Sequence, residues 1–407
     1  MTQTAAPAII CLASFHKGLD FLREARAQGA RVFLITKEKL RGEDWAHDAL
    51  ASFIPLPDDA TPELFIQVAS EIKKRNNVAR VVALEEFDVI TAGLVREHLR
   101  LPGLTSSRAR LFRDKLAMRG TARSAGVRVP EFVHLCNFQE VGEFMERVAA
   151  PWVLKPRTDV SAIGIRKVSD AESVWRAMEA LDARERPHER ATFHLLERFV
   201  AGEVFHVDSI VFDGEVVFAG ASRYGRPPLN VMHEGGVYLS STVEYESQER
   251  AALLGINRRV ISALGLRRGA THAEFIRGDA DGEYYFLEIA ARVGGAFTAE
   301  TLEAATGVNL WREWAKAELA DVLQPYETPT PRRDYSGIAL SLARQENPDT
   351  SHFDDAEIVL RPRKSHHVAL IVRADTAARV RELLDGYAER FAEEFSAVAP
   401  PPERPPI

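Results

Sequence analysis

Short apolar runs alternate with amphipathic stretches over the first hundred residues of the chain. The apolar runs cover residues 8–13, 31–36 and 80–84, and the amphipathic stretches cover residues 18–28 and 61–76. Runs of this length are typical of buried strands, and strands that alternate with helices typically form parallel β-α-β units. We therefore expect a Rossmann-like parallel layer over residues 1–105. The loop at residues 14–18 lacks the glycine-rich fingerprint of dinucleotide-binding proteins, so this layer is not expected to bind a nucleotide by itself.

The hydrophobic pattern changes after this layer. Residues 152–168 indicate a strand, a loop and a second strand, and from residue 192 onwards the pattern is mostly that of strands. Asp213-Gly214 is a strong signal for a hairpin turn. Helices are expected at residues 171–184, 298–305, 310–323 and 377–395, and a disordered tail at residues 401–407.

The composition narrows the class of protein. The chain has 407 residues, a formal net charge of −7 and 46% apolar residues, which is typical of a globular chain of two or three domains. The mild acidity argues against broad nucleic-acid binding, and no apolar run reaches the ~20 residues that span a bilayer. Cys11 and Cys136 form no metal-spaced pair, and the first residues do not resemble a secretory signal. We therefore expect a cytoplasmic protein without nucleic-acid or membrane partners.

A second predicted hairpin carries two glutamates that would face each other. Its strands are expected at residues 271–276 and 284–290, and Glu274 and Glu288 lie at equal distances from residue 281 in the turn. Opposed side chains in a hairpin lie ~5 Å apart, and like charges so placed repel. A hard divalent cation between the carboxylates removes the repulsion, and Mg²⁺ is often held by carboxylates together with phosphate oxygens. The alternative is an exposed hairpin with solvated glutamates, or a register slipped by one residue.

The period of two in this hairpin has further consequences. It places Glu288, Ala290 and Arg292 on one face. An arginine beyond a metal-binding carboxylate is suited to clamp a phosphate or a substrate carboxylate. In the same register the cross-strand apolar pairs would be Phe275 with Leu287 and Ile276 with Phe286.

Two other segments offer candidate contacts for a nucleotide. Lys155 ends an apolar strand, and the small-residue loop from Ser161 to Gly164 follows it, where backbone N–H groups are suited to a phosphate. The loop is not a Walker P-loop, and a lysine at a strand end is often a surface residue whose stem alone is buried. Backbone groups between Glu197 and Glu203 are suited to an adenine edge, and Glu203 to ribose hydroxyls. A plain surface charge explains Glu197 equally well.

A long polar connection is the remaining candidate. His233, Glu234 and Gly236 lie in it, and long irregular loops inside a compact domain are often functional; the alternative is a plain glycine turn with a satisfied histidine. Glu86 and Arg223 are further substrate contacts that the sequence does not rank. His366 and His367 lie in a strand-like stretch and are interpreted as structural.

The order of these residues resembles that of the ATP-grasp superfamily. The residues, in order, are Lys115, Lys155, Glu197, Glu203, Glu274, Glu288 and Arg292. The matching segments are DKLAMRGTARSAGVRVPEF, WVLKPRTDVSAIGIRKV, LLERFVAGEVFHVDSIV and HAEFIRGDADGEYYFLEIAARVGG. The resemblance implies a mixed α/β and α+β architecture, in which two ATP-grasp subdomains at residues 106–190 and 191–325 follow the Rossmann-like layer. A small C-terminal α+β cap would occupy residues 326–400.

The resemblance also implies roles in nucleotide binding. The family residues that contact ATP phosphates correspond to Lys115 and Lys155, and the loop from Ser161 to Gly164 would cover the phosphates. Adenine would lie against Glu197 and the backbone of Phe199 and Val200, and ribose against Glu203.

The metal and substrate roles follow from the same resemblance. Mg²⁺, for which Mn²⁺ is a substitute, would bind Glu274 and Glu288. The transferring phosphoryl group or acyl phosphate would be stabilised by Arg292 with the turn at Gly294 and Gly295. In amino-acid ligases of the dipeptide-forming kind, a segment similar to His233, Glu234 and Gly236 lines the substrate pocket.

The family chemistry is stepwise. A carboxylate attacks the γ-phosphate to give an acyl phosphate and ADP, and an amine then displaces phosphate. Ala290 stands where many relatives carry Asn, which leaves open whether one or two metal ions bind, and the sequence after Arg292 lacks the Glu-His-Pro run of biotin carboxylases.

We therefore expect a carboxylate–amine ligase that acts on small-molecule substrates, with a homodimer as the default assembly. One alternative is a biotin-carboxylase-like or purine-pathway carboxylating enzyme. The other is a non-catalytic nucleotide-binding regulator.

Overall fold

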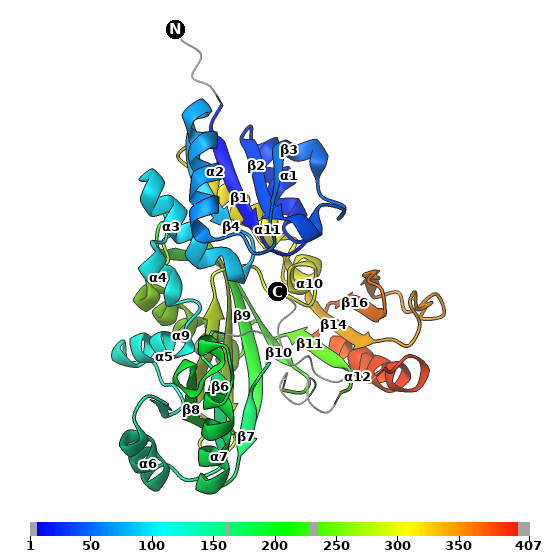
Figure 1. Cartoon of the computed structure of the whole chain (residues 1–407). Coiled ribbons are helices and arrows are strands. Elements are labelled where there is room, and N and C mark those ends of the chain that lie inside the picture. The colour runs from blue at the N-terminus through cyan, green and yellow to red at the C-terminus, as the bar shows by residue number, and fades with distance from the viewer. Residues whose placement is uncertain (1–5, 159–162, 228–230, 232–234, 398–407) are drawn as a thin grey trace.

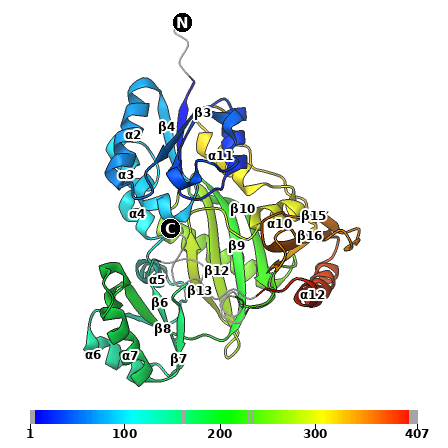
Figure 2. The same ribbon diagram turned by 45° about the vertical axis from the view of Figure 1, so that its right-hand side comes forward.

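The computed structural model of the chain describes residues 6–158, 163–227, 231 and 235–397. It contains three sheets, which form a parallel N-terminal layer, a large antiparallel sheet and a small sheet beside it (Figures 1 and 2). The predicted α/β and α+β architecture is confirmed. The tail predicted at residues 401–407 lies outside the described residues.

The N-terminal layer is a parallel sheet in the order β3-β2-β1-β4. Its strands are β1 (Ala8–Ala13), β2 (Arg31–Lys37), β3 (Leu50–Leu56) and β4 (Val78–Ala83), and its helices are α1 (Leu19–Ala27), α2 (Pro62–Arg75) and α3 (Val89–Leu99). All of β1 is buried, because helices pack on both faces of the sheet, and this explains its uninterrupted apolar run. The sequence pattern did not predict β3, which is a half-exposed edge strand that contains Pro55.

The large sheet has the strand order β13-β12-β9-β10-β11-β14-β16-β15. Its strands are β9 (Gly202–Phe212), β10 (Glu215–Tyr224), β11 (Tyr238–Thr242), β12 (Gly269–Gly278), β13 (Tyr284–Ala290), β14 (Tyr335–Leu342), β15 (Ile358–Leu360) and β16 (His367–Ala374). The hairpin predicted at Asp213-Gly214 is confirmed, with positive φ angles of 51° and 90° at these two residues. The C-terminal strands extend this same sheet through the β11–β14 pairing, and α12 (Ala377–Glu394) packs on β14 and β16.

The small sheet lies at the side of the large sheet near β13 (Figure 2). It is antiparallel in the order β5-β8-β6-β7, with strands β5 (Phe132–His134), β6 (Trp152–Pro156), β7 (Arg166–Val168) and β8 (His194–Arg198). Helices α6 (Phe138–Arg147) and α7 (Ala171–Asp182) cover it and share a hydrophobic core with its strands. Lys155 and Glu197 come from its two central strands.

Two of the other helices lead from the N-terminal layer to the small sheet, and three lie between strands of the large sheet. They are α4 (Ser106–Arg110), α5 (Lys115–Ser124), α9 (Gln248–Leu264), α10 (Thr298–Thr306) and α11 (Leu310–Leu319), with short 3₁₀ helices at Glu38–Leu40, His47–Ala49, Glu86–Asp88, Pro187–Glu189 and Ala191–Phe193. The expectation of mostly strands after residue 192 was wrong for α9. This helix begins at Ser247, whose hydroxyl accepts a hydrogen bond from the Arg250 N–H, and ends at Gly265 in the left-handed region.

Within the described ranges, no helix combines the length and the apolar character that crossing a membrane requires.

Gly202 tests the strand pairing that supports the site hairpin. A Cβ atom at this position would lie 1.9 Å from the Arg277 carbonyl oxygen on the neighbouring strand β12. We expect Gly202→Ala to lower the free energy of unfolding by about 2 kcal/mol or more, because backbone rather than a flexible side chain must move. The matched control is Gly120→Ala in the middle of α5, where a Cβ meets nothing within 4 Å. This control should raise stability by roughly 0.5–1 kcal/mol. Equal stabilities of the two variants in urea unfolding would contradict the assignment.

Candidate active site

Two glutamates face each other across the hairpin of β12 and β13. Glu274 pairs with Glu288 in the strand register, as the sequence predicted. The predicted apolar pairs were wrong, because Phe275 pairs with Phe286 and Leu287 is an extra residue on β13. A bulge of this kind re-aims the neighbouring side chains and is common beside functional sites.

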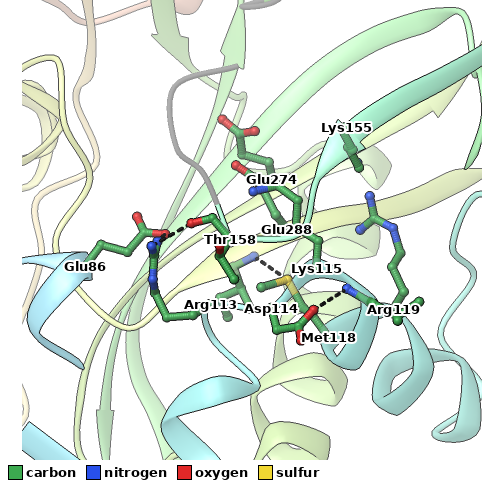
Figure 3. Close-up of polar contacts among 12 residues, drawn as sticks. Glu86, Arg113, Asp114, Lys115, Met118, Arg119, Lys155, Thr158, Glu274 and Glu288 are labelled. Carbon is green, nitrogen blue, oxygen red and sulfur yellow. Dashed lines mark hydrogen bonds and ion pairs between the residues drawn. The ribbon is translucent and has the colours of Figure 1, made fainter. Parts of the chain in front are cut away.

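Lys115 reaches Glu288 from the first turn of α5. The distance from Lys115 Nζ to Glu288 Oε2 is 3.1 Å, and Figure 3 shows Lys115, Glu274 and Glu288 gathered at one place. The start of α5 is tied on two sides: the Asp114 carboxylate accepts hydrogen bonds from Arg157, and the Met118 sulfur accepts one from the Ile289 N–H at 3.3 Å. Loss of solvent raises the pKa of Glu288, but the charges of Lys115 and Lys155 outweigh it and lower the pKa to about 2. Glu288 is therefore a carboxylate at neutral pH.

Lys155 belongs to a buried cluster of three charged residues. Its Nζ lies 2.5 Å from Glu197 Oε1, and Arg119 donates from Nε and Nη2 to Glu197 Oε2 at 3.2 and 3.0 Å. All three side chains are almost completely buried. Burial raises the pKa of Glu197, but Arg119 and Lys155 lower it below the usual range. Burial and the charge of Arg119 lower the pKa of Lys155 to about 8, against the opposing effect of Glu197.

The sequence analysis missed Arg119. This side chain also donates from Nη1 to the Phe286 carbonyl at 3.2 Å, so it connects α5 with the hairpin. Its position four residues after Lys115 was the available signal, since residues four apart lie on one face of a helix.

The predicted adenine-binding segment lies beside this cluster. The Phe199 N–H donates to the Pro151 carbonyl at 3.1 Å, and Lys167 Nζ lies 3.9 Å from the centroid of the Phe199 ring. Val200 packs against a cluster of apolar and tyrosine side chains on β9, β10, β12 and β13. The Phe199 N–H therefore already has a backbone acceptor, and the role of this segment in adenine binding stays a prediction.

Glu203 is not brought together with the other predicted nucleotide residues. Side chains alternate along β9, so Glu203 lies on the opposite face of this strand from His206, whose register partner is Glu274. Its carboxylate pairs with Arg223 at 3.2 Å and with Arg277 at 3.6 Å. Arg223, a candidate substrate contact in the sequence, lies in this same group away from the facing glutamates.

The N-terminal layer contributes Glu86, which follows strand β4 at the carboxyl edge of the parallel sheet. Glu86 Oε2 lies 2.9 Å from Arg292 Nη2, and Glu86 Oε1 lies 2.5 Å from Arg113 Nη1. Arg113 also donates to the Thr158 carbonyl at 2.6 Å (Figure 3). Burial raises the pKa of Glu86, but Arg292 and Arg113 lower it below the usual range. Glu86 was one of two candidate substrate contacts that the sequence did not rank, and Arg113 was not identified from the sequence.

Several predicted site residues lie in, or close to, segments that the structure does not describe. Ser161, His233 and Glu234 lie outside the described residues. Gly164 and Gly236 have positive φ angles of 72° and 122°, which favour glycine. Outside the site, His367 Nδ1 lies 2.8 Å from the Ser365 carbonyl oxygen, consistent with a structural role.

A second group of titratable residues lies beside Glu274 on the same face of the sheet. It was not identified from the sequence. His206, Asp208 and His272 offer ligand atoms that all lie within 4.8 Å of one another. Burial raises the pKa of Asp208, but His272 and His206 lower it well below the usual range. Burial lowers the pKa of His272, but the Asp208 carboxylate raises it to about 10.

The donor set of the facing glutamates fits a hard divalent cation. Both side chains end in carboxylate oxygens, which are the ligands that Mg²⁺ and Mn²⁺ prefer. Glu288 is about one-third exposed, with a relative side-chain accessibility of 36%, so a ligand can approach it. Lys115 and Lys155 bring two positive charges close to these glutamates, and such charges are suited to phosphate oxygens.

The pKa of Lys155 provides a test of its predicted contact with a nucleotide phosphate. Lys155 is protonated below about pH 8 and neutral above it, so its attraction for a nucleotide phosphate should fall as the pH rises from 7 to 9.5. We expect the dissociation constant of a nucleotide, measured by titration calorimetry, to rise across this range. In Lys155→Arg the guanidinium stays charged, and this rise should be smaller. The same pH profile in both proteins would contradict a phosphate contact by Lys155.

Comparisons with known proteins agree with this geometry. Residues 148–300 match the family model of the ATP-grasp domain. The L-arginine-specific L-amino acid ligase of Bacillus subtilis is 24% identical over 265 residues, which are 64% of this chain and 63% of that protein. The chain thus spans less than two thirds of the length of this relative.

Solved structures share the fold. An L-amino acid ligase from Bacillus licheniformis superposes with a TM-score of 0.72 at 20% identity, covering 96% of this chain and 98% of that chain. The biotin carboxylase domain of Hydrogenobacter thermophilus 2-oxoglutarate carboxylase, solved with MgADP and bicarbonate, gives 0.70 at 15% identity and covers 95% and 90% of the two chains. The resemblance seen in the sequence is confirmed: residues 148–300 match the ATP-grasp domain model, and amino-acid ligases are among the proteins to which this chain is similar.

Proposed function

We propose that this protein is an ATP- and magnesium-dependent ligase that joins an amino acid or another small carboxylic acid to an amine, with release of ADP and phosphate. The observation that carries the proposal is the direct opposition of Glu274 and Glu288, with Lys115 3.1 Å from one of them. The relatives named as amino-acid ligases support this reaction class over others.

The chemistry needs positive charge around a spreading phosphoryl group and no covalent enzyme nucleophile. A carboxylate oxygen of the substrate forms a bond to the γ-phosphorus while the bond to the bridging oxygen breaks, and ADP leaves. The amine nitrogen then forms a bond to the acyl carbon, and phosphate and a proton are released. Magnesium held by Glu274 and Glu288 would neutralise phosphate charge during this chemistry.

We propose that Arg292 acts on the acyl phosphate. It lies two residues after the end of β13, the strand that carries Glu288. Glu86 fixes its guanidinium from the N-terminal layer, and the Arg292 Nη1 donates to the Val293 carbonyl at 3.0 Å. Burial lowers the pKa of Arg292, but Glu86 and Glu85 raise it above the usual range, so the positive charge persists at every physiological pH.

Two other readings compete with the ligase. The likeness to a biotin carboxylase domain shows the fold alone, and the sequence after Arg292 lacks the Glu-His-Pro run. A non-catalytic regulator would bind ATP without turnover. Its support in the sequence is Ala290, which replaces a residue that many relatives use near the metal.

A phosphate-release screen over pairs of amino acids with MgATP tests the proposal, with bicarbonate as a separate arm. The ligase predicts that phosphate release requires both a carboxylate and an amine, and that mass spectrometry finds their amide. Release that depends on bicarbonate would favour carboxylation. Tight ATP binding without release across the panel would favour the regulator.

Glu288→Gln tests the metal assignment. We expect ADP formation to fall at least about a hundredfold, because a carboxylate that would hold the metal is removed. The variant should stay folded with a slightly lower melting temperature, because the relief of the repulsion from Glu274 is offset by a weaker contact with Lys115. The matched control is Glu283→Gln, an exposed glutamate at the turn of the same hairpin whose carboxylate lies 3.5 Å from Arg128. Turnover of Glu288→Gln equal to that of this control would refute the assignment.

A further inference from the structure

Strands of the large sheet carry a ring of polar side chains, of which the proposed reaction uses only Glu274 directly. We call it the polar ring; its members are His206 and Asp208 on β9, Tyr224 on β10, Tyr238 and Ser240 on β11, and His272 and Glu274 on β12. The register pairs His206 with Glu274 and Asp208 with His272, so these four side chains share one face of the sheet.

Hydrogen bonds and one longer ion-pair contact, between His272 and Glu274, run around the polar ring from Asp208. Its Oδ2 lies 2.6 Å from His206 Nδ1 and its Oδ1 lies 2.8 Å from His272 Nδ1. On the far side of His272, Nε2 lies 3.6 Å from Glu274 Oε1. On the far side of His206, Nε2 lies 2.8 Å from the Ser240 hydroxyl.

The two tyrosines close the polar ring at Glu274. The Tyr224 hydroxyl donates to Glu274 Oε1 at 2.8 Å. Tyr238 hydrogen-bonds with Tyr224 and with Ser240. One carboxylate oxygen of Glu274 is thus approached by both the Tyr224 hydroxyl and the His272 imidazole, which leaves Oε2 free of these contacts.

Burial makes these contacts restrictive. Asp208 is fully buried, with 0% relative accessibility, and His206 is nearly so at 2%. Without water as an alternative partner, a turned imidazole would leave a buried polar atom unsatisfied, which is costly. The orientation of Asp208 therefore fixes both imidazoles.

The polar ring also supports the turn after Arg292. A Cβ atom at Gly294 would lie 2.8 Å from both Asp208 Oδ1 and His272 Nδ1. The backbone of Gly294 therefore packs directly on the Asp208–His272 pair. The buried Asp208 carboxylate therefore contacts both His272, which lies beside Glu274, and the backbone of Gly294, two residues after Arg292.

We propose that Asp208 is a positioning residue: through His272 it orients the Glu274 carboxylate for the divalent cation, and through Gly294 it seats the turn that follows Arg292. This inference rests on the proposed function, because it takes Glu274 as a metal ligand. Outer hydrogen-bond partners of metal ligands typically contribute 10–100-fold to metal affinity.

Direct binding of Mn²⁺ to the full chain tests the inference without turnover. The concentration of free Mn²⁺ is measured by electron paramagnetic resonance in the presence of a non-hydrolysable ATP analogue. We expect Asp208→Asn, which keeps the shape but can no longer accept from both imidazoles, to weaken Mn²⁺ binding about 10–100-fold. Tyr224→Phe, which removes a single hydroxyl, should weaken it by a smaller factor and guards against misfolding of the first variant.

Ser209→Ala is the matched control. Ser209 is the next residue of the same strand, is fully buried, and points to the opposite face, where its hydroxyl accepts from Asn257 Nδ2 at 2.8 Å. It should lower the melting temperature and leave Mn²⁺ affinity unchanged.

Two results would overturn the positioning role while leaving the proposed function intact. One is wild-type Mn²⁺ affinity in both folded variants, Asp208→Asn and Tyr224→Phe. The other is nitrogen coupling from an imidazole to bound Mn²⁺ in electron spin echo spectra, since a histidine would then be a ligand itself. Absence of nucleotide-dependent Mn²⁺ binding in the wild type would instead overturn both the metal site and the polar ring's role.

Discussion

The site depends on two carboxylates that repel each other and that the fold nevertheless holds face to face. Glu274 and Glu288 sit opposite each other on paired strands, where two carboxylates disfavour each other unless positive charge lies between or beside them. In the described structure Lys115 lies against Glu288, and the charges of Lys115 and Lys155 keep that carboxylate ionised. A bound divalent cation would supply the positive charge that the two carboxylates need. Phosphate groups would supply the negative charge that the two lysines need.

Each of the three sheets supplies one part of the site. The large sheet provides the hairpin and the polar ring, and the small sheet provides Lys155 and Glu197. The parallel layer provides Glu86 at the carboxyl edge of its strands, the edge at which open α/β sheets commonly bind ligands. Since Glu86 contacts both Arg292 and Arg113, the N-terminal layer constrains Arg292 as well as the segment at Thr158 that follows β6.

Sequence patterns predicted local features well and long-range ones poorly. The buried strand β1 appeared as an apolar run and β13 as one strand of a hairpin, both with the observed bounds. The facing of Glu274 and Glu288 followed from equal spacing about one turn. The bulge at Leu287 was invisible, because it depends on how β13 fits its partner rather than on its own residues.

Contacts between side chains from distant segments of the chain were also not predicted from the sequence. Glu197 meets Arg119 across a separation of 78 residues, and His272 meets Asp208 across 64, so no local pattern records these pairs. Glu203 was assigned to the nucleotide from motif order, although alternation along β9 places it on the opposite face from His206. The order of motifs predicted the match to the ATP-grasp domain model, whereas the faces of the strands decide which residues meet.

The most direct test of the account is a crystal of the full chain with Mn²⁺ and a non-hydrolysable ATP analogue, measured by anomalous diffraction at the manganese edge. The account predicts an anomalous peak between the carboxylates of Glu274 and Glu288, with phosphate oxygens completing the coordination and Lys115 and Lys155 turned toward the phosphates. A peak elsewhere, for example on His206, Asp208 and His272, with the two glutamates left apart, would contradict it.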